Sequence, residues 1–131
     1  MSHLAAALAL DPAVLDARWA RLQAWLATRF GKDAVSIEGV LFLVGVQSEG
    51  GGYAPRLEKD AKERIILEAS FVVFEALGLY RRAGMDAEGA WLWERTEDLP
   101  ELPADAQERL LRTAILRYFE PYTGDPDGAL A

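Results

Sequence analysis

The sequence predicts a mainly α-helical fold, a compact bundle of about four main helices around one buried central helix, with a short β-hairpin between the last two. Apolar residues recur at helical spacing in four segments, and the segment 56–80 is apolar on almost every side, so it needs neighbours all round. Two tryptophans separated by one residue follow a glycine-containing turn, which is typical of a hairpin. With 51% hydrophobic residues among 131, the chain can build one domain with its own core.

The first long helix is expected over residues 13–30. Asp11 and Pro12 form a start signal, because the carboxylate caps the first turn and proline suits the first helical position. Gly31 ends the helix. The predicted inward stripe contains Leu15, Trp19, Leu22, Leu26 and Phe30. The residues placed away from that stripe are Asp16, Arg18, Arg21, Gln23 and Arg29.

Residues 1–11 are expected to form a loose segment that contains a short helix. The apolar run at its start has no basic residues before it, so it does not resemble a signal peptide. Residues 1–122 are interpreted as a single helical domain, and residues 123–131 as a disordered tail.

The second element, residues 34–47, is apolar on all sides except at Ser36, Glu38 and Gln47. The part from 40 to 46 is rich enough in β-branched residues to form a buried strand, and periodicity leaves helix and strand both open for so short a run. A helix is favoured, because a lone strand has no partner among helices. Gly39 and Gly45 would also allow another helix to pack closely.

The polar residues of the central helix, 56–80, gather in one stripe that contains Arg64, Glu68 and Glu75. One interpretation is a solvated stripe in which Arg64 pairs with Glu68. The other is a carboxylate pair that faces a ligand or a cation, since carboxylates removed from water need partners.

The glycine-rich segment before the central helix favours a flexible turn over an anion-binding loop, because no phosphate-binding motif is present. In the binding interpretation, Glu68 and Glu75 would face Glu38 or Glu49 of the second element. The candidate ligand-binding residues are Gln47, Glu49, Tyr53, Arg56, Glu68 and Glu75.

The hairpin is predicted from Gly84, Asp86 and Gly89, which mark a turn, and from Trp91 and Trp93 on one face of the following strand. Packing of this hairpin on the helices is favoured, because an isolated hairpin is marginally stable in water. If the tryptophans are exposed instead, they form a protein-binding patch. The candidate interface residues are Trp91, Trp93, Arg81 and Arg82.

The last helix is expected over residues 104–119, with Pro121 ending it. Its inward stripe is predicted to contain Leu111, Ala114, Ile115 and Tyr118, with Leu110 and Phe119 at the edges.

The residue types present exclude several kinds of chemistry. The chain has no cysteine and one histidine, His3, which excludes disulfides, thiolate metal sites, cysteine nucleophiles and Ser-His-Asp catalysis. A metal site would need oxygen ligands, which suit Mg²⁺, Ca²⁺ or Mn²⁺. The net charge of −7 opposes binding to nucleic acid or to an anionic membrane. No catalytic residue, metal ligand or cofactor is assigned, and the expected location is cytoplasmic.

The segments VLFLVGVQSEGGGY and GMDAEGAWLWE resemble stretches of a small bacterial protein family of unknown function. The similar part runs from about residue 38 to residue 119. The resemblance implies one compact, mainly helical domain, and it brings no activity, cofactor or site residue with it.

Two classes of function follow from these observations. The favoured hypothesis is a non-catalytic protein-interaction or scaffold module, whose partner is a second copy of the chain or another protein. The alternative is a protein or enzyme that binds a small molecule or a hard cation (Mg, Ca or Mn) between the second and central helices. Neither hypothesis involves nucleic acid or a membrane.

Overall fold

The computed structural model describes residues 2–31, 36–48 and 59–122. Within them the chain forms five helices and one two-stranded antiparallel sheet, so the predicted mainly helical fold with a hairpin before the last helix is confirmed. The elements are α1 (His3–Leu8), α2 (Pro12–Phe30), α3 (Ile37–Ser48), α4 (Lys59–Leu77), β1 (Tyr80–Met85), β2 (Trp91–Arg95) and α5 (Ala104–Phe119).

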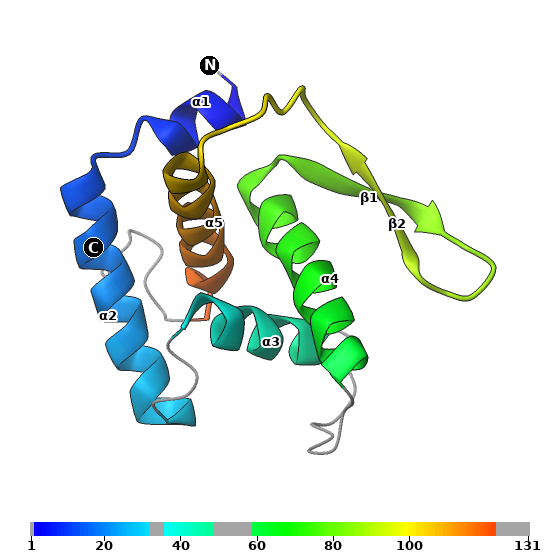
Figure 1. Ribbon diagram of the computed structural model, residues 1–131, viewed down its shortest axis with the longest axis horizontal. Coiled ribbons are helices and arrows are strands. Elements are labelled where there is room, and N and C mark those ends of the chain that lie inside the picture. Colours follow the sequence, from blue (N-terminus) through cyan, green and yellow to red (C-terminus); the bar gives the residue numbers. More distant parts are fainter. Residues whose placement is uncertain (1, 32–35, 49–58, 123–131) are drawn as a thin grey trace.

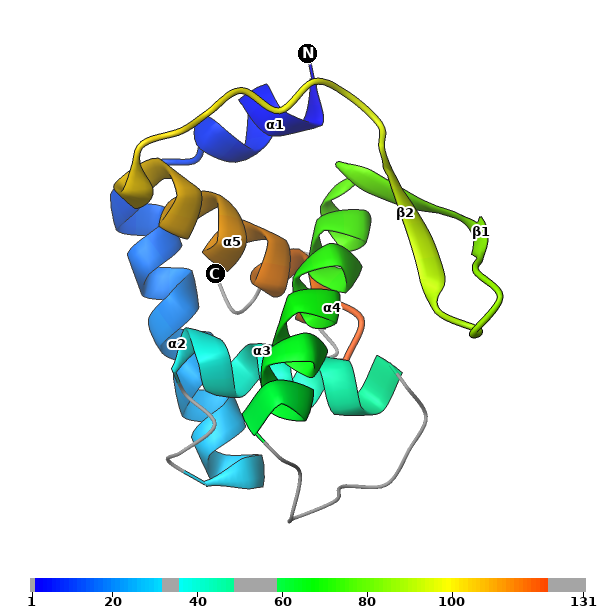
Figure 2. The same cartoon turned by 45° about the vertical axis from the view of Figure 1, so that its right-hand side comes forward.

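The helices pack around a shared apolar core (Figure 1). Helix α5 contacts α1, α2 and α4, while α3 packs on α4. The hairpin leaves the C-terminal end of α4 and projects on the side of the molecule away from α2, as both views show (Figure 2). The largest fully buried side chains come from four helices and from the residue before the hairpin: Leu15, Leu22, Leu26, Val40, Val44, Val73, Leu79 and Ile115.

The local signals at the ends of α2 act as the sequence predicts. The Asp11 carboxylate accepts a hydrogen bond from the Ala13 N–H at 2.8 Å, and Gly31 ends the helix with φ of 89°. The predicted stripe is buried except for Phe30, which is 48% exposed. Its burial was predicted wrongly, because the last turn of α2 extends beyond α3 and therefore beyond the core (Figure 1).

Helix α3 resolves the choice between helix and strand for residues 40–46. Ser36 caps it, since its hydroxyl accepts a hydrogen bond from the Gly39 N–H at 3.0 Å. The predicted close approach of a second helix is found at Gly45: a Cβ there would contact the Ile65 side chain and lie 2.7 Å from the Ile65 carbonyl oxygen. A glycine is therefore required where α3 packs on α4.

Helix α4 is less completely buried than its sequence predicts. Its buried residues face α3 and α5, but Leu67 is 60% exposed. The helix ends where Gly78 adopts φ of 91°, as expected for a C-terminal glycine. The prediction that α4 is covered on nearly every side was wrong at Leu67, because three neighbouring elements leave one strip of the helix uncovered.

Helix α5 has the predicted bounds, but its buried face is wider than the predicted stripe. Leu110, Leu116 and Phe119 are buried, while Leu111 and Tyr118 are half-buried. The reason is that α5 has packed neighbours on three sides, so a single inward stripe does not describe it. Among the described residues, no helix is both long and apolar enough to cross a membrane.

The N-terminal segment is docked on the core. Leu4 and Ala7 of α1 are buried, and Ser2 caps the helix by accepting a hydrogen bond from the Ala5 N–H at 3.0 Å. The Glu97 carboxylate, which follows β2, accepts hydrogen bonds from the N–H groups of His3 and Leu4 at 3.0 and 3.4 Å. A carboxylate from a distant segment thus satisfies the first turn of α1. The predicted tail, 123–131, lies outside the described residues.

Candidate functional site

The hairpin turn is organised by one carboxylate. Asp86 Oδ1 accepts hydrogen bonds from the backbone N–H groups of Glu88 and Ala90, at 2.8 and 3.0 Å. Gly89 takes φ of 84°, a conformation that favours glycine. The turn predicted from Asp86 and the flanking glycines is therefore confirmed, and it fixes the end of the hairpin.

The strand register decides which side chains share a face of the hairpin. Arg82 pairs with Trp93 and Met85 pairs with Trp91, so the side chains of each pair lie on the same face. The register shifts between Arg82 and Gly84, which is a β-bulge. Because of this bulge, Met85 rather than Gly84 joins the tryptophan face.

The base of this face is attached to α4. The Trp93 indole Nε1 donates a hydrogen bond to Glu68 Oε1 at 2.7 Å. The Phe71 ring stacks on Trp93 with a centroid separation of 5.6 Å and an angle of 11° between the rings, and it meets Tyr80 edge-on at 5.1 Å. The predicted packing of the hairpin on the helices is therefore found at Trp93.

The second carboxylate of the predicted stripe also binds the hairpin. Arg82 Nε lies 3.1 Å from Glu75 Oε2, and the Arg82 guanidinium lies 4.8 and 5.2 Å from the ring centroids of Trp91 and Trp93. One cation thus holds a carboxylate and two indoles together. Within the described residues, Glu68 and Glu75 therefore each bind a side chain of the hairpin.

The outer end of the hairpin exposes large apolar side chains. Met85 is 54% exposed, Leu92 48% and Trp91 38%. Trp91 was a predicted interface residue, whereas Met85 and Leu92 were missed. The strand alternation could have placed Leu92 on the face opposite the tryptophans, but the bulge that turns Met85 toward them has no clear sequence signal. The fourth predicted interface residue, Arg81, pairs with Glu94 at 3.0 Å.

The predicted ligand site is not assembled from the described residues. The described part of the structure does not include Glu49, Tyr53 and Arg56, or the side chain of Gln47. Glu38 lines an open pocket of about 380 Å³ between α3 and α4 together with Glu63, Ser70 and three apolar residues, and neither Glu68 nor Glu75 lines that pocket. The described part of the chain holds no group of three or more His, Asp or Glu residues placed to bind a metal.

The site described here is therefore a hairpin with a fixed base and an exposed apolar end. The carboxylates at its base are engaged by Trp93 and Arg82. Comparisons with protein-family models, with curated proteins and with solved structures give no match to this chain.

Proposed function

We propose that this chain is a non-catalytic protein-interaction module that uses its hairpin to bind a second copy of itself. The helices serve as a bundle-like scaffold, with α4 as the element that presents the hairpin. The observation that supports this function is the exposure of Met85, Trp91 and Leu92 at the end of a hairpin whose base is attached to α4.

The attachment favours binding because it lowers the entropic cost of association. A hairpin that is already held by Glu68, Glu75 and Phe71 does not need to be ordered when a partner binds. Tryptophan and methionine are also enriched in protein interfaces, where they supply a large apolar contact area. The hairpin thus combines rigidity with the residue types that interfaces use.

The charge distribution makes the hairpin the place where two copies repel each other least. The whole chain carries a net charge of −7, so two copies repel each other over most of their surfaces. The hairpin is an exception, because three arginines balance three carboxylates between residues 80 and 95: Arg81, Arg82 and Arg95 against Asp86, Glu88 and Glu94.

The strand edges offer a matching geometry. In the described sheet, β1 and β2 pair only with each other, so each strand has one outer edge whose backbone groups can pair with another strand. Two identical edges can pair across a twofold axis and give a four-stranded sheet. Such a sheet would place Met85 and Trp91 of both copies on one face and Leu92 of both copies on the other.

The test is the molar mass of the full chain, measured by light scattering over a wide range of concentrations. We expect a dimer that dissociates on dilution. Trp91→Ser and Leu92→Ser should each weaken it by at least about tenfold, since each removes an apolar contact worth more than about 1.4 kcal/mol. Leu67→Ser is the matched control, because Leu67 is an exposed leucine outside the hairpin.

Two outcomes would overturn the proposal. If the chain stays monomeric at every concentration, it does not form the proposed homodimer. A dimer that survives both hairpin substitutions, or that Leu67→Ser weakens instead, uses another surface. Circular dichroism of each variant would show that the fold is retained.

A further inference from the structure

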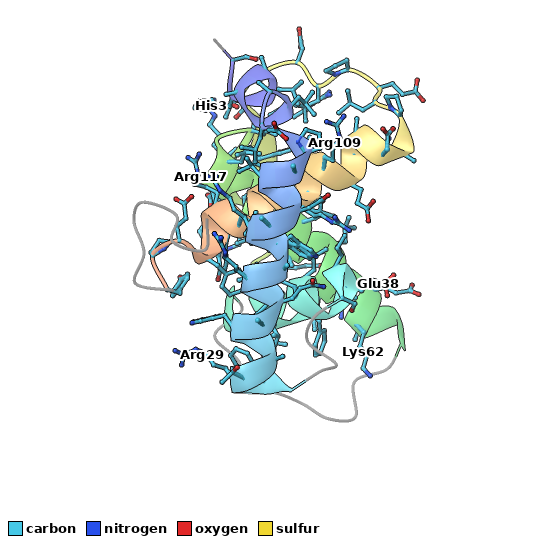
Figure 3. All side chains as sticks on the ribbon, turned by 90° about the vertical axis from the view of Figure 1, so that its left-hand side faces the viewer. His3, Arg29, Glu38, Lys62, Arg109 and Arg117 are labelled. Carbon is cyan, nitrogen blue, oxygen red and sulfur yellow. The ribbon has the colours of Figure 1, made fainter. Side chains whose placement is uncertain are left out.

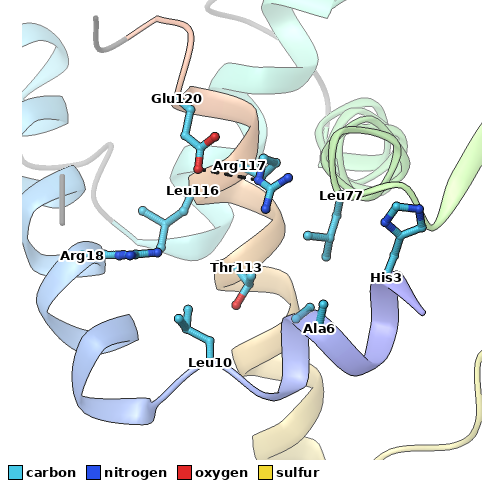
Figure 4. Close-up of a pocket in the computed structure, with 10 residues that line it drawn as sticks. His3, Ala6, Leu10, Arg18, Leu77, Thr113, Leu116, Arg117 and Glu120 are labelled. Carbon is cyan, nitrogen blue, oxygen red and sulfur yellow. Dashed lines mark ion pairs between the residues drawn. The ribbon is translucent and has the colours of Figure 1, made fainter. Parts of the chain in front are cut away.

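A second feature lies where α1, α2 and α5 meet the C-terminal end of α4. A pocket of about 140 Å³ opens there, lined by side chains from all four helices and from the link after α1 (Figure 4). No local sequence pattern indicates this pocket, because its walls come from positions more than a hundred residues apart, from His3 to Glu120.

Arg18 is the unusual residue of this pocket. The residue is only partly exposed, and its Nε is buried without a hydrogen-bond partner among the described residues. Figure 4 shows the side chain reaching from α2 toward Leu116 of α5. Arg18 is one of the residues that line the pocket, and it carries its charge on a long apolar stem. A buried donor without a partner in the protein costs free energy, which makes Arg18 a candidate for binding a ligand.

Arg112 provides the contrast on the neighbouring helix. Its Nε is also buried without a partner in the described part of the chain, but its terminal nitrogens pair with Asp16 at 3.6 Å and with Glu108 at 3.3 Å. Its guanidinium also lies 5.4 Å from the centroid of the Trp19 ring. Arg112 is therefore a structural arginine. No ion pair is found for Arg18 within the described residues, which distinguishes the two.

A second cation lies at the same pocket. Arg117 lines it from α5, and its Nε lies 3.6 Å from Glu120 Oε1, a long separation for an ion pair (Figure 4). Two arginines and one carboxylate give the pocket one excess positive charge in a chain whose net charge is −7. The local electrostatics therefore favour an anion with a single negative charge.

The remaining lining is mixed. Its apolar part consists of Leu10, Leu77 and Leu116 together with Ala6 and Ala7 of α1, and its polar part of His3 and Thr113. The volume of about 140 Å³ is close to the roughly 150 Å³ of an engineered protein cavity that admits benzene. A ligand that fits both the arginines and the apolar part has a charged end and an apolar body of about that size.

We propose that this pocket binds a small organic monocarboxylate with an aromatic or short aliphatic body. The carboxylate pairs with the planar guanidinium of Arg18, whose donors match the two carboxylate oxygens. The apolar body contacts the leucines of α4 and α5. A phosphate group fits less well, because it carries a larger charge and has no apolar part to fill the wall.

The test uses the full chain and three probes: benzoate, its uncharged analogue benzamide, and inorganic phosphate. Titration is followed by the amide NMR signals of Ala6, Thr113 and Leu116, which belong to the pocket. We expect saturable shifts with benzoate, at least about tenfold weaker binding of benzamide, and no competition from phosphate, since a hydrogen bond to a charged group is worth more than 1.4 kcal/mol.

Substitution separates this pocket from general attraction of anions. Arg18→Met keeps an apolar stem and removes the guanidinium, so we expect a loss of benzoate affinity of at least about tenfold. Arg29→Met is the matched control, because Arg29 lies at the other end of α2, away from His3 and Arg117 (Figure 3). It should leave the affinity unchanged.

Three results would overturn the inference. Benzoate could leave the pocket amides unshifted, benzamide could bind as well as benzoate, or Arg29→Met could weaken binding as much as Arg18→Met. Phosphate that competes with benzoate at equal concentration would overturn the assignment of a carboxylate. The amide spectrum of the unliganded Arg18→Met variant shows whether it is folded. Arg18→Lys keeps the positive charge but loses the planar pair of N–H donors, so it should bind benzoate with intermediate affinity.

Discussion

Arg82 and Arg18 are used in different ways in two regions of the molecule. Arg82 joins the hairpin to α4, and its guanidinium contacts Glu75, Trp91 and Trp93 at once. Arg18 lines the pocket between α1, α2 and α5, and its buried Nε has no partner in the described structure. The first arginine holds two parts of the fold together, while the second has capacity left for a ligand.

The difference shows how a structural polar group can be told from a candidate binding group. A buried polar group whose partners are all in the protein contributes to stability, and removing it leaves those partners unpaired. A buried polar group without partners costs stability, and removing it should relieve that cost. Stability measurements can therefore test the assignment of both regions independently of any ligand.

The largest effect is expected for Trp93→Ala. This change removes the stacking on Phe71 and the hydrogen bond to Glu68, and it should lower the free energy of unfolding by about 2–3 kcal/mol. Trp91→Ala should cost less than about 1 kcal/mol, because Trp91 is exposed and loses mainly its contact with Arg82. Urea unfolding measures both. Equal losses of free energy would mean that the base and the end of the hairpin contribute equally to stability.

A smaller effect, of opposite sign at the two sites, is expected for arginine-to-methionine changes. Arg82→Met should destabilise the fold by about 1 kcal/mol, and the loss should shrink at high salt, because the pair with Glu75 is partly exposed. Arg18→Met should leave stability unchanged or raise it by up to about 1 kcal/mol. A destabilisation by Arg18→Met as large as that by Arg82→Met would show that Arg18 is structural.

The smallest effect concerns the half-buried Tyr118 at the end of α5. Burial and the neighbouring Tyr122 raise the pKa of Tyr118 from 10.0 to about 12. The unfolded chain therefore loses this proton at lower pH than the folded chain. The contribution of protonated Tyr118 to the free energy of unfolding is fully present below pH 10.0. It is lost as the pH rises toward 12.

Alkaline titration followed by tyrosinate absorbance measures this shift. Wild-type protein should show one tyrosine that ionises after the others, and Tyr118→Phe should remove that late step. The variant should also lose less stability between pH 10.0 and 12 than the wild type. A late step that persists in Tyr118→Phe would assign it to another tyrosine.

The parts of the fold that the sequence predicted depend on local signals. Asp11, Pro12 and Gly31 mark the ends of α2, and Asp86 with Gly89 sets the turn of the hairpin, because each acts on backbone within a few residues. These signals work whatever the tertiary structure is.

The parts that were predicted wrongly depend on which element covers which face. Leu67 is apolar but exposed, Phe30 lies past the end of the core, and Arg18 was placed on the outer side of α2 although it is half-buried. A helical wheel gives the angle between side chains and does not identify the neighbour at each angle. The two carboxylates of α4 illustrate this, since Glu68 and Glu75 were correctly placed on one stripe, but their partners in the hairpin were not foreseen.

The docking of α1 has a consequence for folding kinetics. A helix of six residues is too short to form alone, so α1 depends on contacts with α5 and on Glu97, which lies 94 residues from His3 along the chain. Closing so long a loop costs chain entropy, and the cost is recovered only after α4, the hairpin and α5 are in place. Helix α1 should therefore be the last element to join and the first to open, and the pocket that it closes should exist only in the fully folded chain.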